Sequence, residues 1–212
     1  MKQSQQWQVQ NRFLELRSKW LTVIGENLQD HEGQLLEYWR VEKADSVVIL
    51  PIQNNYVILP PPSYRPGVGD FTLDFPGGRV PNDKSPEVAV PAILLREMGI
   101  SENHITKISA LNTQGWLVNS SFSNQKLYGC VAEIEPNIEI NPEYIGAVYP
   151  INSTGVNDLF NHLHCLQCRA VFMQWWFNNQ ETESEKVLCS HCQRTATNGI
   201  KCKGICVADN DY

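Results

Sequence analysis

Short runs rich in β-branched residues, bounded by polar loops, dominate the first two thirds of the chain. Residues 46–52 and 56–60 form two such runs, separated by the polar residues 53–55. This pattern predicts a β-hairpin. The apolar residues within 105–110 and 126–134 predict two further strands.

The two ends of the chain have different patterns. Residues 1–20 mix aromatic and polar side chains irregularly, and we interpret them as an ordered arm. Residues 20–41, with a turn at 31–33, predict a second hairpin. In residues 156–178 the apolar side chains recur every three to four positions, which predicts one continuous helix.

A Gly-rich loop followed by a helix occupies the middle of the chain. The glycine pair at 77–78 follows an apolar run and precedes Ser85 and Pro86. Ser is a favoured N-cap and Pro is favoured at the first helical position, whereas Gly99 is suited to end the helix in a left-handed conformation. A strand, a loop and a helix are therefore predicted in sequence, with Pro91 expected to kink the helix.

This stretch resembles the Nudix box, Gly-x5-Glu-x7-Arg-Glu-U-x-Glu-Glu-x-Gly-U, where U is a bulky aliphatic residue. Laid over residues 78–100 without a gap, five of its nine fixed positions match. The matching residues are Gly78, Leu94, Glu97, Gly99 and Ile100. The resemblance implies an α/β fold, the Nudix α/β/α sandwich with a mixed sheet, here with an N-terminal arm and a Cys-rich C-terminal tail.

The positions that depart from the box are the ones that carry its chemistry. In Nudix enzymes three Glu at helical spacing project from one face and hold Mg²⁺ or Mn²⁺. Here that face carries Ile93, Arg96 and Glu97, and Lys84 replaces the first Glu of the box. One carboxylate beside a guanidinium is a poor site for a hard dication. We therefore interpret the chain as a Nudix scaffold with a degenerate box, in which Glu97 is the one Glu of this helix face that is kept.

The segment before the box resembles the ADP-ribose pyrophosphatase branch of the family, where a Tyr-Arg-Pro turn precedes the box. The matching turn is residues 64–66, so the resemblance implies that Arg65 contacts substrate; a surface ion pair is the alternative for this Arg. Asp74 takes the place of a family Glu and is a second candidate metal ligand. Residues 115–125 correspond to the loop that helps to select the substrate, and Glu143 corresponds loosely to a later catalytic carboxylate.

The candidate site residues implied by the resemblance fall into three groups. The candidate catalytic residues are Glu97 and Glu143, the substrate-binding residues are Arg65, Gly78, Lys84 and Arg96, and the Mg²⁺ ligands are Asp74 and Glu97.

Cysteines at metal-ligand spacing fill the end of the chain. One set, Cys189, Cys192, Cys202 and Cys206, flanks an Asn-Gly turn and would place four thiolates around one zinc ion. A competing set combines Cys165 and Cys168 with the first pair of the tail. We favour the tail set slightly, because a regular helix over 156–178 would commit Cys165 and Cys168 to helical geometry. Free thiols in the tail are the remaining alternative.

Composition limits the class of protein. The 212 residues include 42% hydrophobic and 19% charged residues, an ordinary globular composition. The net charge of −6 argues against nucleic acid as a partner. No window is long and apolar enough for a membrane helix, and no signal peptide is recognised, so a cytoplasmic protein is expected. Seven Cys in such a chain favour metal ligation or free thiols over disulfides.

We divide the chain into an N-terminal arm and hairpin (1–45), a Nudix domain (46–178) and a Cys-rich tail (179–212). Three functions stay open. The chain binds a nucleotide diphosphate such as ADP-ribose with weak or no hydrolysis; or it is an active Mg²⁺-dependent pyrophosphohydrolase with a rearranged carboxylate set; or it is a structural protein that dimerises and holds zinc in its tail. Whether it is an enzyme is left open, and a homodimer is expected.

Overall fold

A computed structural model describes residues 6–81, 83–180, 192, 194 and 200. The chain divides into two compact units, Met1–Met173 and Gln174–Tyr212. The first unit contains every described strand of the sheets. Within the described residues, no helix is long and apolar enough to cross a membrane.

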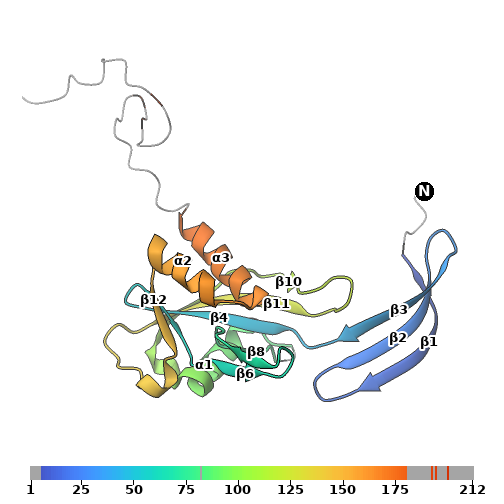
Figure 1. Cartoon of the computed structure of the whole chain (residues 1–212), viewed down its shortest axis with the longest axis horizontal. Helices are drawn as coiled ribbons and strands as arrows, with labels where there is room; N and C mark the ends of the chain where they lie inside the picture. The colour runs from blue at the N-terminus through green and yellow to red at the C-terminus, as the bar shows by residue number, and fades with distance from the viewer. Residues whose placement is uncertain (1–5, 82, 181–191, 193, 195–199, 201–212) are drawn as a thin grey trace, which may run out of the picture. The chain divides into compact units, whose positions relative to one another are not determined.

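The N-terminal residues form an antiparallel sheet of their own (Figure 1). It contains β1 (Gln8–Arg17), β2 (Thr22–Gln29) and β3 (Leu35–Glu42), in the order β1-β2-β3. The hairpin predicted at residues 20–41 is confirmed. The predicted arm contains a ten-residue strand, whose register with β2 shifts twice along its length.

A buried carboxylate holds the three strands of this sheet together. Glu26 of β2 is only 2% exposed and accepts hydrogen bonds from Arg12 of β1 and Arg40 of β3, at 3.0 Å from each Nε. Hydrogen bonding by Arg40 first, and then by Arg12, holds the pKa of Glu26 below its ordinary value. A buried charge is tolerated here because both of its oxygens are paired with guanidinium groups.

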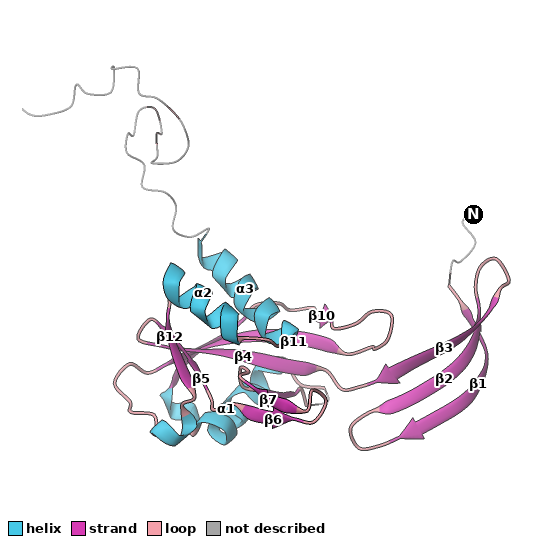
Figure 2. Ribbon diagram, viewed as in Figure 1, coloured by secondary structure: helices cyan, strands magenta, loops and turns pink. Residues whose placement is uncertain are grey.

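The second sheet forms the centre of the fold and is mixed (Figure 2). Strand β4 (Ser46–Gln53) lies parallel to β11 (Lys126–Ile134) and antiparallel to β5 (Tyr56–Leu59). Its main path runs β10-β11-β4-β5-β12, and two further strands pair with β4 and β11. The remaining members are β8 (Gly77–Arg79), β9 (Ile105–Ala110), β10 (Trp116–Leu117) and β12 (Ala147–Pro150). All four strand predictions from the apolar runs are confirmed within one residue.

A small hairpin and the helices complete the described elements. Strands β6 (Ser63–Arg65) and β7 (Asp70–Thr72) pair in a two-stranded sheet. Helix α1 (Val90–Met98) lies on one face of the central sheet, and α2 (Ser153–His162) and α3 (Leu166–Gln180) lie on the other (Figure 1). The predicted α/β/α sandwich with a mixed sheet is thus observed. Three short 3₁₀ helices are η1 (Pro86–Ala89), η2 (Glu102–His104) and η3 (Pro142–Tyr144).

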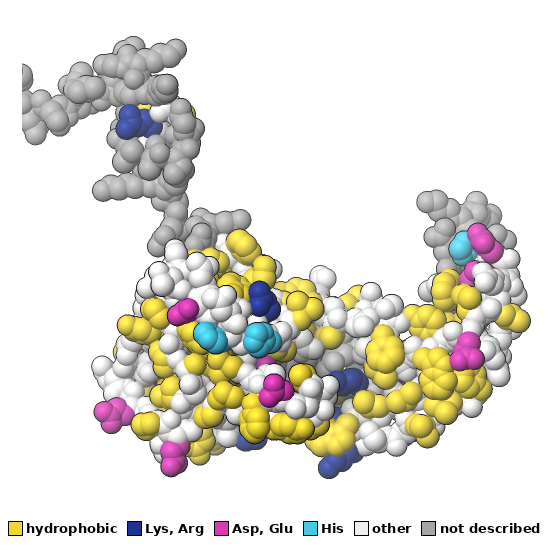
Figure 3. Space-filling model, viewed as in Figure 1, with side chains coloured by type: hydrophobic (Ala, Val, Ile, Leu, Met, Phe, Trp, Pro, Cys, Tyr) yellow, Lys and Arg dark blue, Asp and Glu magenta, His cyan; other side chains and the backbone are white. Residues whose placement is uncertain are grey.

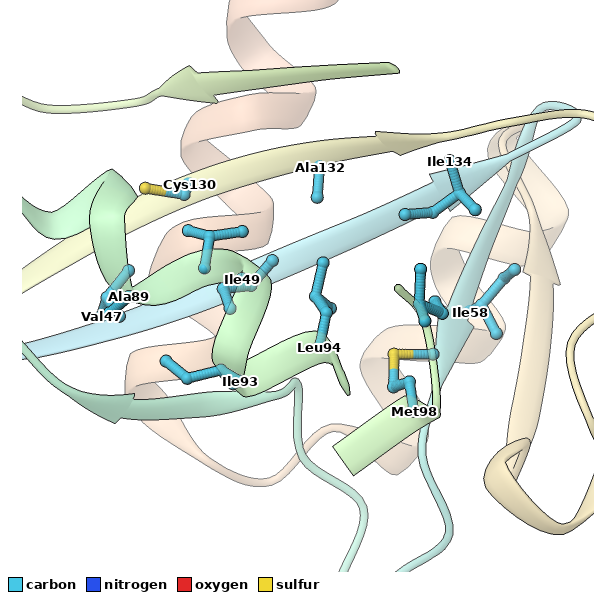
Figure 4. Packing of buried hydrophobic residues seen from close by; sticks show 12 residues of the cluster. Val47, Ile49, Ile58, Ala89, Ile93, Leu94, Met98, Cys130, Ala132 and Ile134 are labelled. Carbon is cyan, nitrogen blue, oxygen red and sulfur yellow. The ribbon is translucent and has the colours of Figure 1, made fainter. Parts of the chain in front are cut away.

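The core under α1 is aliphatic. Side chains from α1, including Ile93, Leu94 and Met98, point toward Ile49 of β4 and Ala132 of β11 (Figure 4). Alternate residues of a strand face one side of a sheet, so the two buried strands present a continuous apolar surface to the helix. Cys130 is fully buried in this cluster, in agreement with its interpretation as a small core residue, and burial raises its pKa to about 12.

Two helix predictions were wrong. The expected single helix over 156–178 is two helices, because the chain leaves helical geometry between His162 and Leu166. Leu163 has an extended backbone conformation there, and its side chain is fully buried. An apolar residue at this position therefore fits a buried turn between two helices as well as one continuous helix. The predicted kink at Pro91 is absent, because α1 begins at Val90, after the 3₁₀ turn η1, and a Pro in the first turn leaves no donor unsatisfied.

Candidate functional site

The Gly-rich loop is fixed by strand pairing and by close contact with α1. Strand β8 pairs with β4, and its two glycines lie beside Ile93 and Arg96 of α1. A Cβ on Gly78 would lie 2.9 Å from Cδ1 of Ile93, closer than a real contact allows. At the far end of α1, Gly99 takes a left-handed φ of 66° and caps the helix, as predicted.

A compact ion pair occupies the place where this loop meets the helix. Nη2 of Arg96 lies 2.6 Å from Oε1 of Glu97 and 3.2 Å from the carbonyl oxygen of Gly77. The other carboxylate oxygen of Glu97 accepts a hydrogen bond of 3.2 Å from the backbone N–H of Gly77. The guanidinium of Arg96 therefore lies between a carbonyl oxygen and a carboxylate oxygen, which are the ligand types that a hard dication uses.

These residues do not fit a Mg²⁺ or Mn²⁺ ion. Both oxygens of Glu97 already have partners, and one partner is a permanent cation. The helical position that carries a Glu in Nudix enzymes is Ile93, which is 3% exposed and packs in the core beneath the loop. A dication at this point would have to displace Arg96, and no second carboxylate of the helix face is there to replace it.

The other candidate residues lie at separate points. Arg65 pairs with Asp74 through Nε and Oδ2 at 2.8 Å, so an ion pair is present at this Arg. Lys84 lines a cavity of about 350 Å³ together with Asp45, Val80 and Tyr128 among others. Glu143 is exposed in η3, and the neighbouring Tyr144 lies against Gly99 at the end of α1.

The loop at 115–125 forms hydrogen bonds with the N-terminal sheet. The backbone N–H of Val41 donates to Phe122 at 2.8 Å, and Tyr38 donates its hydroxyl hydrogen to the carbonyl of Ser121. Next to the box glycines, Arg79 donates to the carbonyls of Lys19 and Trp20 at 2.9 Å each. The N-terminal sheet is thus anchored beside both the box loop and the loop expected to select the substrate.

A second cluster of chemically reactive side chains lies at the start of α3. The ligand atoms of Asp74, Cys165 and Cys168 all lie within 4.8 Å of one another. A hydrogen bond from the Cys168 side chain lowers the pKa of Cys165 to about 6. The same hydrogen bond, together with burial of Cys168, raises the pKa of Cys168. Sequence reasoning treated Asp74 and this Cys pair separately; the Cys-x-x-Cys spacing was the available signal.

Most of the tail candidates lie outside the described residues. Of the preferred zinc set, Cys189, Cys202 and Cys206 lie outside the described residues, and Cys192 is described as a free thiol. The expectation that one helix contains both Cys165 and Cys168 was wrong for Cys165, which precedes α3, whereas Cys168 lies in α3.

Taken together, the mixed sheet between helices and the strand–loop–helix at the box define a Nudix-like fold. A solved structure described as that of an ADP compounds hydrolase is similar to this chain, with a TM-score of 0.66 and 21% identity over 83% of this chain and 96% of that one. At this identity the likeness shows the fold. Residues 177–212 match a family model described as a domain of unknown function (DUF8639). A comparison with curated protein sequences finds no significant match.

Proposed function

We propose that this protein binds a nucleotide diphosphate compound, of which ADP-ribose is the model, and hydrolyses it weakly or not at all. The observation that carries the proposal is the position of Arg96 between the Gly77 carbonyl and Glu97. A fixed guanidinium there supplies positive charge to the diphosphate without a metal ion. Because Glu97 is paired with this guanidinium, it is not available to bind a metal ion.

Arg96 has room to bind an anion while it keeps these contacts. Both hydrogen bonds described above use Nη2 and the side chain is 59% exposed, which leaves the other N–H groups of the guanidinium to bind an anion. In the proposal Gly78 allows the phosphate to approach the loop backbone, and Lys84 and Arg65 add positive charge. Charge-assisted hydrogen bonds of this kind are about twice as strong as neutral ones.

The roles proposed for the carboxylates are limited. Asp74, Glu97 and Glu143 form the rearranged set on which an active Mg²⁺-dependent enzyme would have to rely. Of these, Glu97 is paired with Arg96 and Asp74 with Arg65. The pairing of two of the three carboxylates favours binding over hydrolysis.

We also propose that the protein forms a homodimer through the N-terminal sheet. Large apolar side chains gather on this sheet (Figure 3). The N-terminal apolar patch, as we define it, comprises Phe13, Leu16, Trp20, Leu35 and Trp39, each more than two fifths exposed. Aromatic residues are enriched in protein interfaces, and β1 is an edge strand with one partner in its sheet. A second copy of the chain is the proposed occupant of this patch.

The remaining proposals concern the tail and the compartment. We propose three domains, with boundaries at 1–45, 46–178 and 179–212. In the last of these, the tail cysteines hold zinc. The described cysteines Cys130, Cys165, Cys168 and Cys192 are free thiols, which fits the reducing cytoplasm that we propose.

Turnover of ADP-ribose tests the lack of hydrolysis. The purified wild-type protein is incubated with ADP-ribose over a range of Mg²⁺ and of Mn²⁺ concentrations, and AMP is quantified by chromatography. We expect no metal-dependent increase above the rate without protein. Rapid Mg²⁺-dependent release of AMP, lost in Glu97→Gln, would contradict the proposal and would establish the rearranged carboxylate set as the active site.

A further inference from the structure

The thiols of Cys165 and Cys168 lie close together at the first turn of α3. The carbonyl of Cys165 accepts the first hydrogen bond of the helix, from the N–H of Arg169 at 3.0 Å, so Cys165 is the N-cap and Cys168 is the third helical residue. An N-cap side chain points back toward the N–H groups of the first turn. This geometry brings the two sulfur atoms together on the side that faces the central sheet, where Cys168 is buried.

Asp74 brings a third ligand from a different part of the chain. It lies between β7 and β8, and its side chain is only 11% exposed. Its Oδ2 is held by Arg65 and by the hydroxyl of Thr72, both at 2.8 Å. Its Oδ1 is buried and has no hydrogen-bond partner among the described residues. An unpaired buried carboxylate oxygen is costly, and here it lies beside two thiols.

We propose that Asp74, Cys165 and Cys168 bind a zinc ion, with Oδ1 and the two sulfur atoms as ligands. Zinc takes thiolate and carboxylate ligands in a tetrahedron, with Zn–S near 2.3 Å, which sets the ligand atoms about 3.8 Å apart. The observed cluster, with all ligand atoms within 4.8 Å, reaches this arrangement by small side-chain rotations. Two soft sulfur ligands favour Zn²⁺ over Mg²⁺.

The charges and protons of the site balance. Binding requires both sulfurs as thiolates, so the thiol protons are released to solvent. Two thiolates and one carboxylate around Zn²⁺ leave one net negative charge. The guanidinium of Arg65, on the outer oxygen of Asp74, offsets that charge and orients the carboxylate. A water molecule or an external ligand is left to fill the fourth position.

The site would join α3 to the segment that leads into the box. Asp74 is three residues before Gly77, whose carbonyl and N–H contact Arg96 and Glu97. Zinc would therefore fix the approach to the Gly-rich loop from the opposite face of the sheet. This role does not depend on the function proposed for the loop, because its ligands are separate from Arg96 and Glu97.

The experiment uses the full-length chain with Cys189, Cys192, Cys202 and Cys206 all changed to Ser. This variant removes the tail thiols and leaves Cys130, Cys165 and Cys168. Metal content is measured after zinc loading and dialysis, and Co²⁺ is then substituted for the absorption spectrum. We expect one metal ion per chain, with sulfur-to-cobalt charge-transfer intensity for two thiolates, and thermal unfolding at a lower temperature after chelation. Absence of zinc and of cobalt binding in the folded variant would overturn the proposal.

Asp74→Asn, made in the same variant without tail thiols, tests the carboxylate without removing Cys165 or Cys168. The Asn oxygen can still accept from Arg65 and Thr72, so the fold is expected to persist, as circular dichroism would check. We expect zinc affinity at this site to fall at least tenfold, and Cys168→Ser to abolish it. If zinc binding in that background is unchanged in Asp74→Asn, or if a four-thiolate cobalt spectrum of the wild-type chain is lost in Cys168→Ser, the ligand set proposed here is wrong.

Discussion

Arg96 illustrates how one side chain can change the chemistry of a position while the backbone stays the same. In the box alignment it replaces a Glu, and the sequence predicted that this would spoil a metal site. The structure adds where the guanidinium goes: to the Gly77 carbonyl and to Glu97. That detail could not be read from the sequence, because a long Arg side chain has many rotamers and its partner is selected by the folded loop.

Glu26 carries a separate prediction, about stability. Replacing it with Gln leaves Arg12 and Arg40 without their buried anion, so we expect the free energy of unfolding to fall by about 1–3 kcal/mol at neutral pH. Denaturant titration measures this change. The exposed Glu42, which also pairs with Arg40, provides the matched control, and Glu42→Gln should change stability by less than about 0.5 kcal/mol.

The effect of Glu26 should depend on pH in a defined direction. Its pKa is lowered in the folded protein, so its stabilisation is complete above the unfolded pKa of about 4.3 and is lost as the pH falls through the folded value. The difference between wild type and Glu26→Gln should therefore shrink under acidic conditions. A difference that stays constant down to the acid unfolding transition would show that Glu26 acts through packing and not through its charge.

Helix α1 determines which box positions can be restored. Changing Lys84, Ile93 and Arg96 to Glu would restore the carboxylates of the box, but Ile93 is buried among aliphatic side chains. Ile93→Glu should destabilise the protein by about 3 kcal/mol or more, because it places a carboxylate in an apolar core. The double variant Lys84→Glu/Arg96→Glu should retain wild-type stability and gain affinity for Mn²⁺. Thermal unfolding and calorimetry with Mn²⁺ would check both results, and an equally stable triple variant would contradict this account.

The accuracy of the sequence predictions varied among the elements for physical reasons. The buried strands β4 and β11 were predicted correctly because their β-branched runs are long and end at turn residues. The helix over 156–178 was not, since periodic spacing alone cannot separate one helix from two joined at a buried Leu163. Pro91 was misjudged because the 3₁₀ turn before α1 shifts the start of the α-helix by four residues.

For the whole molecule, the N-terminal apolar patch predicts self-association. Light scattering at micromolar concentration should give the mass of a dimer. Trp39 and Phe13 form an exposed aromatic pair in this patch. Trp39→Glu places a charge beside Phe13, so we expect a monomer with unchanged circular dichroism. Val68→Glu is a suitable control, since Val68 is exposed in the loop between β6 and β7 and lies outside the patch. A wild-type monomer would contradict the proposed role of this sheet.

The candidate site was only partly predictable from the sequence. The box supplied Gly78, Arg96 and Glu97, which lie close together because they share one loop and one helix. The grouping of Asp74 with Cys165 and Cys168 required the fold, since more than ninety positions separate the carboxylate from the thiols in sequence. Contacts across a sheet leave no local pattern in the chain.

The most direct test of the central claim is calorimetric titration of the protein with ADP-ribose, with and without Mg²⁺. We expect saturable binding with the same affinity in EDTA as in Mg²⁺. In Arg96→Gln we expect an affinity lower by about 10- to 150-fold, because a charge-assisted hydrogen bond contributes about 1.5–3 kcal/mol. Binding that occurs only with Mg²⁺, or that Arg96→Gln leaves unchanged, would show that a metal ion and not the guanidinium holds the diphosphate.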